Sequence, residues 1–312
     1  MEPTAPRWAP ERAIEIAAGT PPGGGLDRVA RALARVITAA KLVDVPVEVL
    51  NVPGDGARRV WSHVDRHPGD AHFAAISSSN QTTDRLVGLA TFDLGNYSPV
   101  ATLVSEYIAF TVRTDSHLKT GNDLLERLAR DAGGVTVSLS TALGNPNHIA
   151  VAKVTRHAGG DINAPRIRVF DTALAVVDDV IAGNADVGAV TAASVLKALQ
   201  AGDVRVLAIS SPERLGPPFT NVPTWGELGA DCVVGAWRGV AGPSGLSADQ
   251  IAFWRDLLSK VVGDPRWQDE LSAHGWSPMH LDGAALHDFL NREREEMQEL
   301  LGELGLLPET SA

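Results

Sequence analysis

Short apolar runs alternate with amphipathic helical stretches along the chain, beginning near its N-terminus. The first run covers residues 13–18, and a glycine-rich loop separates it from a helix that opens at Asp27. In this helix Val29, Leu33 and Val36 recur with the spacing of one helical face, as expected for a helix that packs on a core. The segment therefore predicts a buried strand, a glycine loop and an amphipathic helix, in that order.

The same alternation continues through most of the chain. Further strands are predicted at residues 45–49, 72–77, 134–139, 166–170, 185–190 and 205–209. Longer extended segments are predicted at residues 97–112 and 233–240, and helices at 57–64, 250–262, 266–274 and 283–302, with another beginning near His148. Strands that alternate with helices predict a parallel sheet covered by helices, whose strand-to-helix loops gather at one edge and bind ligands there.

The chain is long enough for two domains. Its 312 residues exceed the size at which a single hydrophobic core usually stops growing. Because a second series of strands starts after the extended segment at 97–112, we predict lobe 1 from residues 13–110 and 236–312 and lobe 2 from residues 111–235. The chain then crosses between the lobes twice, and two close crossing strands form a hinge with limited freedom.

Composition and charge exclude several classes of protein. The hydrophobic content of 44% and charged content of 21% are typical of a globular protein, and no apolar run approaches the ~20 residues of a membrane span. A net charge of −11 leaves no basic surface for a phosphate backbone, so we expect no nucleic-acid partner. The single cysteine, Cys232, excludes an intramolecular disulfide.

The first ten residues lack the apolar core of a signal peptide, so an export signal has been removed or the protein is cytosolic.

Three loops rich in small hydrogen-bond donors follow predicted strands. The first is Thr20-Pro21-Pro22-Gly23-Gly24-Gly25-Leu26-Asp27, where glycines let backbone N–H groups approach an anion at the positive end of a helix. The alternative is a tight turn in which Asp27 caps the helix. The other two loops are Ser77-Ser78-Ser79-Asn80-Gln81-Thr82-Thr83 and Ser140-Thr141-Ala142-Leu143-Gly144-Asn145-Pro146-Asn147-His148. Hydroxyls, amides and helix N-termini suit a carboxylate, although the same residues dominate ordinary turns.

Residues for catalysis or metal binding do not form a recognisable set. The sequence contains no Walker loop, GxGxxG motif or GxSxG elbow, so we predict no catalytic residue and no cofactor. An enzyme acting on a small acid would have Asp171, His148 and Asp27 as its acid–base candidates. His63 and His67 stand four residues apart and could share a zinc ion, but without an HExxH pattern we expect solvated histidines and no metal.

Four segments, in order along most of the chain, carry a family resemblance. They are PGGGLD at residues 22–27 followed by Ala30 and Arg31, VLNVPG at 49–54, GNPNH at 144–148 and NVPTWGELG at 221–229. Together they resemble the tripartite tricarboxylate transporter substrate-binding proteins, also called the Bug receptor family. The resemblance implies an α/β fold of the periplasmic-binding-protein type II, or Venus flytrap, class, with two Rossmann-like lobes joined by two crossing strands.

The same resemblance implies a function. It indicates an extracytoplasmic, periplasmic receptor, not an enzyme, that captures a small organic carboxylate in the cleft between its lobes and delivers it to a membrane permease or a sensor. We expect a monomer, because both lobes must be free to close. A two-lobed α/β enzyme and a cytosolic effector-sensing module are the alternatives.

The resemblance also implies where the ligand binds. The residues it places in contact with ligand are Pro22, Gly23, Gly24, Gly25, Leu26, Asp27, Ser78, Ser79, Asn80, Ser140, Thr141, Ala142, Leu143, Gly144, Asn145, Asn147, Phe170, Asp171, Thr172 and Ala173. Our hypothesis is that the backbone N–H groups of residues 23–26 and 141–144 hold a carboxylate while Phe170 packs on the ligand body.

The chain departs from the family where specificity is set. Residues 169–172 read Val-Phe-Asp-Thr, whereas the family often has Pro-Tyr-Lys-Gly, so the aromatic wall remains but the lysine is lost. Asp171 could accept from a ligand ammonium group, but we favour a role as helix cap. We expect Arg58 and Arg59, which follow the second turn, to face solvent. These departures leave open whether the ligand is a mono- or a dicarboxylate.

Overall fold

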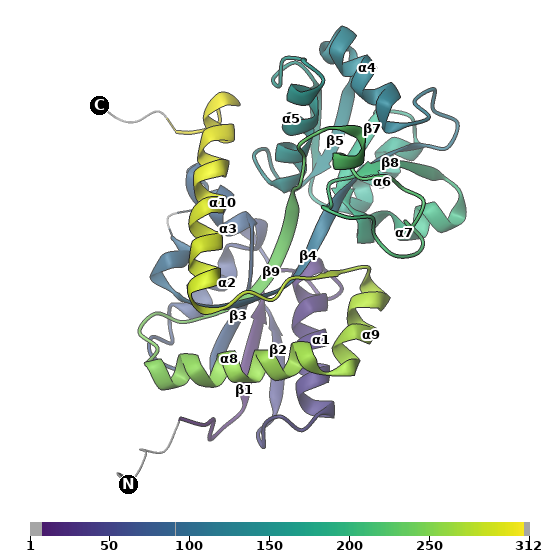
Figure 1. The fold of residues 1–312 in the computed structure, drawn as a ribbon. Coiled ribbons are helices and arrows are strands. Elements are labelled where there is room, and N and C mark those ends of the chain that lie inside the picture. The colour runs from purple at the N-terminus through teal and green to yellow at the C-terminus, as the bar shows by residue number, and fades with distance from the viewer. Residues whose placement is uncertain (1–7, 91, 309–312) are drawn as a thin grey trace. The chain divides into compact units, whose positions relative to one another are not determined.

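The computed structural model describes residues 8–90 and 92–308, which form two compact units. Unit 1 consists of residues up to Ser105 together with Trp237–Arg294, and unit 2 of Glu106–Ala236 together with the residues from Glu295 onward. The boundaries fall inside strands β4 (Ser98–Arg113) and β9 (Gly235–Gly242) and inside helix α10 (Gly283–Glu303). Figure 1 shows these elements along the chain.

Unit 1 is built from strand–loop–helix repeats followed by C-terminal helices. Its elements are β1 (Ile14–Ala18), α1 (Gly25–Ala39), β2 (Val47–Asn51), the 3₁₀ turn η1 (Asp55–Ala57), α2 (Arg59–Val64), β3 (Phe73–Ser78), α3 (Asn80–Leu86), η2 (Leu94–Asn96), α8 (Ala248–Gly263), α9 (Pro265–His274) and β10 (Ser277–Pro278), with the unit's parts of β4, β9 and α10. Its strands are ordered β2-β1-β3-β9-β4, and β10 pairs with β4. Strand β1 is parallel to both β2 and β3, so the loops that follow these three strands share one edge of the sheet.

Alternation along β1 explains why both faces of this sheet are covered. Ile14, Ile16 and Ala18 are buried in the larger core with α1, α8 and α9, which Figure 1 shows on the same side of the sheet. Ala17 points the other way, into a smaller core that contains Trp61. Successive side chains of a strand face opposite sides, so Glu15 lies on the same face as Ala17, where it contacts His63 of α2, and helices cover both sides of the sheet.

Unit 2 repeats the architecture. Its elements are α4 (Gly121–Asp131), η3 (Ala132–Gly134), β5 (Thr136–Ser140), α5 (Pro146–His157), β6 (Arg166–Phe170), α6 (Ala173–Ile181), β7 (Val187–Thr191), α7 (Ala192–Ala201), β8 (Val204–Ile209) and η4 (Gly226–Leu228), with the unit's parts of β4, β9 and α10. Strand β5 is parallel to both β6 and β7, and its register pairs Ser140 with Phe170. The loops after β5 and β6 therefore begin side by side.

The sheet is mixed, which corrects the expectation of a parallel sheet. Strand β9 runs antiparallel to β3, and β4 runs antiparallel to β7 and β8. The sequence pattern could not reveal this, because an apolar run has the same composition in either direction. Helices α1 and α5 also begin two residues earlier than predicted, at Gly25 and Pro146, since backbone geometry rather than the first polar cap residue sets where a helix starts.

Candidate functional site

Two of the predicted ligand loops lie together in unit 1. The loop at residues 22–27 follows β1 and the loop at residues 78–80 follows β3, and these strands are parallel neighbours. Their loops therefore emerge at the same edge. Helix α3 begins at Asn80, so a single residue, Ser79, separates it from β3.

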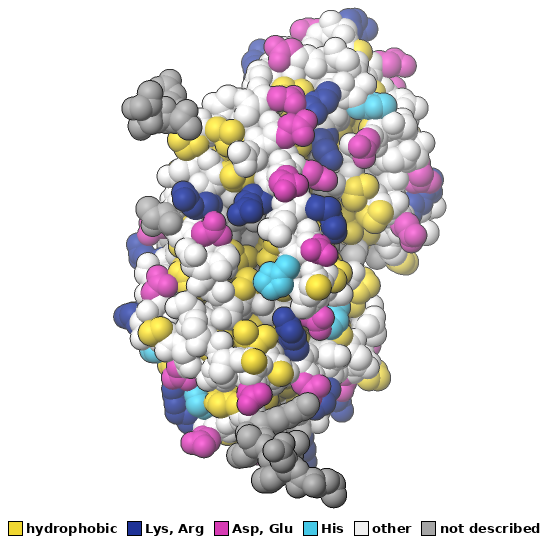
Figure 2. All heavy atoms as spheres, turned by 60° about the vertical axis from the view of Figure 1, so that its left-hand side comes forward, with side chains coloured by type: hydrophobic (Ala, Val, Ile, Leu, Met, Phe, Trp, Pro, Cys, Tyr) yellow, Lys and Arg dark blue, Asp and Glu magenta, His cyan; other side chains and the backbone are white. Residues whose placement is uncertain are grey.

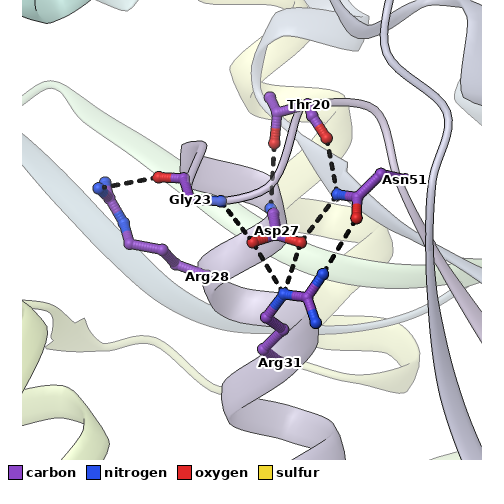
Figure 3. Close-up of polar contacts among 6 residues, drawn as sticks. All are labelled: Thr20, Gly23, Asp27, Arg28, Arg31 and Asn51. Atoms are coloured by element: carbon purple, nitrogen blue, oxygen red, sulfur yellow. Dashed lines mark hydrogen bonds and ion pairs between the residues drawn. The ribbon is translucent and has the colours of Figure 1, made fainter.

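Asp27 is the centre of a hydrogen-bond network that shapes the first loop (Figure 3). Its carboxylate accepts from Gly23 N–H at 2.7 Å, from Arg31 Nε at 2.9 and 3.0 Å, and from Asn51 Nδ2 at 2.8 Å. Asn51 also donates to the Thr20 carbonyl at 2.8 Å and accepts from Arg31 Nη2 at 3.1 Å. The side chain of Asp27 is 1% exposed, and it joins the loop to the end of β2.

The ionisation of Asp27 follows from this network. Burial alone would raise the pKa of the carboxyl, but the hydrogen bonds from Arg31, Asn51 and Gly23 outweigh burial and lower the pKa. Asp27 is therefore a carboxylate, and it lies in the first turn of α1, where a negative charge is favourable. The helix is capped by Gly24 rather than by Asp27, which corrects the alternative that Asp27 is the cap.

The network decides which backbone donors remain for a ligand. Gly23 N–H is taken by Asp27, and Gly24 N–H donates to the Pro21 carbonyl at 2.9 Å. Within the described residues, the N–H groups of Gly25 and Leu26 have no acceptor. The predicted anion site at residues 23–26 thus narrows to two consecutive donors in the first turn of α1.

A cation that the sequence analysis did not single out lies next to these donors. Arg238 on β9 pairs across the sheet with Ser78, and its side chain is close to Gly25, since a Cβ added at Gly25 would lie 3.9 Å from Arg238 Nη2. Ser79 Oγ, in the neighbouring loop, is buried and has no hydrogen-bond partner among the described residues. Two more groups that suit an anion are therefore present at this edge of unit 1.

The two predicted loops of unit 2 are joined through the backbone. Thr141 N–H donates to the Phe170 carbonyl at 2.8 Å, which links the loop after β5 to the end of β6. Thr141 has a φ of +75°, a left-handed conformation that is strained for a β-branched residue. Strain of this kind is concentrated at functional sites, where the surrounding contacts hold it in place.

Asn145 and His148 hold the loop after β5 from within. Asn145 caps α5 by accepting from His148 N–H at 3.1 Å, and its Nδ2 donates to the Ser140 carbonyl at 2.5 Å and to Thr141 Oγ1 at 2.9 Å. His148 Nδ1 accepts from Gly144 N–H at 3.0 Å. Burial lowers the pKa of His148 to about 4, so the ring is neutral and carries its proton on Nε2.

The hydrogen bonds within this loop leave a few of its backbone N–H groups without an acceptor among the described residues. Thr141 and Gly144 have acceptors for their N–H groups, whereas Ala142, Leu143 and Asn147 have none among the described residues. Asn147 lies in the first turn of α5, where the helix dipole favours an anion. The predicted clamp at residues 141–144 therefore narrows to residues 142 and 143, with Asn147 in addition.

The loop after β6 differs from expectation at Asp171. Thr172 caps α6, since its side chain accepts from Ala175 N–H at 3.2 Å, so the cap role that we favoured for Asp171 is wrong. Asp171 is exposed. Phe170 is half-buried, and the guanidinium of Arg168 lies 5.6 Å from the centre of its ring. Asp179 accepts two hydrogen bonds from Arg168, each at 2.9 Å, and so fixes the cation beside the ring.

The residues considered for metal binding or catalysis contact other side chains or are buried. His63 Nε2 lies 2.5 Å from Glu15 Oε1, and the His67 ring stacks on Phe73 at 3.5 Å between centroids, so neither is the solvated histidine that we expected. Residues 8–90 and 92–308 contain no cluster of three or more His, Cys, Asp or Glu side chains arranged to hold a metal ion. Cys232 is buried, and burial raises its pKa to about 12, which keeps it a thiol.

Two further residues, Arg58 and Asn51, were only partly identified as functional candidates from the sequence. Arg59 is exposed, but Arg58 does not face solvent, because its side chain is 25% exposed and its guanidinium lies 3.3 Å from Asp84. Asn51 belongs to the VLNVPG segment used for the family resemblance, and its role in tying loop to strand became visible only in the structure. Arg238 gave no sequence signal, because an isolated arginine in a strand is common.

Comparison with protein families gives one match over most of the chain. The model of the tripartite tricarboxylate transporter family receptor, TctC, matches residues 29–306. A curated relative, protein BugT of Bordetella pertussis, is 26% identical over 277 residues, which cover 86% of this chain and 82% of BugT.

Solved structures share the fold. A TctC solute-binding protein from Polaromonas is 25% identical, with a TM-score of 0.74 over 95% of this chain and 99% of that one. An R. palustris protein with adipate is 18% identical, with a TM-score of 0.82 over 96% of this chain and 99% of that one. These likenesses confirm the predicted α/β fold of the periplasmic-binding-protein class.

Proposed function

Because the chain belongs to the tripartite tricarboxylate transporter receptor family, we propose that its loops bind a small organic carboxylate for transport. One observation carries the proposal: among the residues that the structure describes, backbone N–H groups at the starts of α1 and α5 have no acceptor, although the neighbouring N–H groups of both loops do. Consecutive free donors at a helix N-terminus favour an anion without requiring a charged side chain.

In unit 1 the proposed contacts are the N–H groups of Gly25 and Leu26, the Ser79 hydroxyl and the guanidinium of Arg238. The cation matters because the chain carries a net charge of −11, whose field opposes an anionic ligand. Asp27 and Gly23, which we predicted as contacts, act instead by holding the loop in shape. Pro22 and Gly24 belong to the same turn.

In unit 2 the proposed contacts are the N–H groups of Ala142, Leu143 and Asn147 and the ring of Phe170. Leu143 is 41% exposed and Phe170 half-buried, so both offer apolar surface to a ligand body. Ser140, Thr141, Gly144 and Asn145 hold the loop through their hydrogen bonds. Thr172 caps α6, Asp171 and Ala173 flank it, and Ser78 and Asn80 flank Ser79 in unit 1.

A carboxylate is the ligand class that these groups fit. The proposed contacts are hydrogen-bond donors, apart from the apolar side chains of Leu143 and Phe170, and a carboxylate only accepts hydrogen bonds. A structural neighbour has been solved with adipate, a dicarboxylate, which is consistent with this class. We propose binding without turnover, because Asp27 is ionised and fully hydrogen-bonded and neutral His148 already accepts from Gly144.

The receptor is proposed to act outside the cytoplasm. Proteins of the TctC family serve tripartite transporters, and we propose that this chain, as a monomer, passes its ligand to the membrane permease of such a system. In the part of the chain that the structure describes, no helix is both long and apolar enough to cross a membrane.

The site can be tested at Gly25, where a side chain would fill the space in front of the free donors. A Cβ at Gly25 meets nothing closer than 3.9 Å, so Gly25→Leu leaves the loop intact but occupies the position of the ligand. Calorimetry against a panel of mono- and dicarboxylates should find an acid that binds the wild type and is recovered unchanged. A ligand at ~100 times its dissociation constant adds ~2.7 kcal/mol to stability, so a thermal-shift screen will identify it first.

Gly263→Leu is the matched control, because Gly263 ends helix α8 and a Cβ there meets no atom within 4 Å. We expect Gly25→Leu to weaken binding at least about tenfold, or ~1.4 kcal/mol, and Gly263→Leu to leave it unchanged. Equal affinity in the two variants would remove the α1 loop from the proposed site. Consumption of the acid would show an enzyme and contradict the receptor function.

A further inference from the structure

Unit 1 contains a pocket whose lining includes none of the residues proposed to contact the transported ligand, although Gln81 and Thr82 at the end of the second donor-rich loop belong to it. It has a volume of about 180 Å³ and is lined by α3, by residues 93–99 and by the segment of α10 from His287 to Arg294. Its apolar lining consists of Leu86, Leu94, Tyr97, Pro99 and Leu290. At ~30 Å³ per water molecule in the liquid, the volume corresponds to about six waters, which suits a small organic molecule.

Two arginines from different elements line this pocket. Arg85 lies on α3 and Arg294 on α10, and in residues 8–90 and 92–308 neither side chain makes a hydrogen bond or ion pair. Elsewhere in unit 1, Arg35 is bound by both carboxylate oxygens of Glu270 at 2.7 Å. Arg85 and Arg294 are both exposed, so an anion can reach their guanidiniums, and both line the same partly apolar pocket.

The lining holds two guanidiniums against one carboxylate, so its formal charge is positive. Asp93 is the one carboxylate in the pocket lining, and its Oδ1 accepts from Gly95 N–H at 2.8 Å. Glu293, next to Arg294, is directed elsewhere, since it accepts from Trp237 Nε1 at 2.5 Å and from Thr82 Oγ1 at 3.2 Å. His287 adds a further donor to the lining. Figure 2, in which the side of unit 1 that carries α3 and α10 comes forward, shows basic and apolar side chains exposed near one another on this face.

We infer that this pocket is a second binding site, for a small carboxylate with an apolar body such as an aromatic or short aliphatic monoacid. The apolar body would lie on Leu86, Tyr97 and Leu290, and the carboxylate would receive hydrogen bonds from Arg85 and Arg294. This pairing follows from the chemistry of the lining, because the apolar surface stabilises a hydrophobic group while a guanidinium pairs with a carboxylate. The site is separate from the loops of the proposed function.

The test uses benzoate as the probe, with the full chain and calorimetric titration. Benzyl alcohol supplies the same ring without the charge, and sulfate supplies the charge without the ring. We expect benzoate to bind more tightly than either. Replacing both cations in the double variant Arg85→Gln/Arg294→Gln should weaken benzoate binding at least tenfold, whereas Arg130→Gln, an exposed arginine on α4 of unit 2, should leave it unchanged.

The same titration in the Gly25→Leu background separates this site from the proposed transport site. Benzoate binding that survives Gly25→Leu but is lost in the double arginine variant supports the pocket. Loss in Gly25→Leu alone would show that benzoate uses the α1 loop and would overturn the inference. Equal affinity for sulfate and benzoate would overturn the inference as well. So would a wild type that binds no benzoate at a concentration on the order of 10 mM, at which even a weak, millimolar site would be occupied.

Discussion

The loop after β1 in unit 1 and the loop after β5 in unit 2 have the same architecture but different chemistry. In both, internal acceptors engage some N–H groups and leave others free at a helix N-terminus. In unit 1 the acceptor is the ionised carboxylate of Asp27, paired with Arg31. In unit 2 it is the neutral imidazole of His148, helped by the amide of Asn145.

The two proposed anion sites are thus held in shape in different ways, by an ion pair in unit 1 and by neutral side chains in unit 2. A charged network tolerates partial exposure, as at Arg31, whose side chain is 44% exposed. The neutral network of unit 2 needs no counterion, because a buried amide or imidazole requires only a hydrogen-bond partner, whereas the buried carboxylate of Asp27 depends on its pairing with Arg31. The two loops should therefore respond to pH in different ranges.

The largest expected effect is on the pH dependence contributed by His148. Burial lowers its pKa in the folded state to about 4, against 6.5 for an ordinary histidine, so the unfolded chain takes up a proton first as the pH falls. Stability is then lost between pH 6.5 and about 4, by roughly 3 kcal/mol at ~1.36 kcal/mol per unit. Urea unfolding of the wild type and His148→Asn at several pH values measures this loss, because Asn supplies an acceptor that does not titrate.

The difference in unfolding free energy between these two proteins should change steadily across that range and be constant above it. A difference that stays constant from pH 7 to pH 4 would mean that His148 is not neutral for the reason given. Asp27 does not interfere, since its lowered pKa places its contribution at lower pH, where stability is lost as the carboxylate is protonated.

The next effect is the loss of the ionic network in Asp27→Asn. The variant keeps the size of the side chain but offers one acceptor oxygen in place of two to Gly23 N–H, Arg31 and Asn51. We expect about 2 kcal/mol of destabilisation and weaker ligand binding, because hydrogen bonds to charged groups contribute ~1.5–3 kcal/mol. Chemical denaturation and calorimetry measure the two effects.

Glu270→Gln is the control for Asp27→Asn, since it also removes the partner of an arginine on α1. Arg35 is 55% exposed, so its pair with Glu270 should contribute less than ~1 kcal/mol. If both variants lose the same stability, the Asp27 network has no special role in the loop.

A third effect concerns the cation that unit 1 has beside its loop. Arg238→Gln should weaken carboxylate binding about tenfold, equivalent to ~1.4 kcal/mol, because a hydrogen bond from a charged donor is replaced by one from a neutral amide. Titrations of the wild type and variant at low and high salt measure it. Unchanged affinity would assign the anion entirely to backbone donors, as in unit 2.

Much of each loop's position could be predicted from the sequence. The runs at residues 13–18 and 166–170 correspond to β1 and β6 within one residue, because strong apolar patterning next to turn residues marks strands well. The glycines and small polar residues after them identified the loops. Strand direction and helix starts could not be predicted, since pairing across the sheet depends on contacts far apart in sequence.

The sequence also could not predict which residues of each loop form its internal hydrogen bonds and which do not. Gly23 and Gly25 look alike in the sequence, yet one N–H is taken by Asp27 and the other has no acceptor among the described residues. Asn145 and Asn147 are likewise indistinguishable as residue types, but Asn145 caps α5. Such roles depend on which partner lies within 3 Å, and only the folded chain shows that.

The smallest effect tests the strain at Thr141, a left-handed residue without a counterpart in the loop of unit 1. Gly23, with a φ of +82°, corresponds to Gly144, with a φ of +80°, since each precedes the helix cap, whereas Thr141 has a φ of +75° directly after β5. Thr141→Ala keeps the strain and loses the hydrogen bond from Asn145 Nδ2, so it should destabilise by about 1 kcal/mol. Thr141→Gly loses the same bond but releases ~1 kcal/mol of strain, so its stability should lie close to that of the wild type. Urea unfolding of the pair measures the strain directly. If both variants are equally destabilised, the left-handed conformation costs threonine nothing here, and the hydrogen bonds of the loop alone account for its stability.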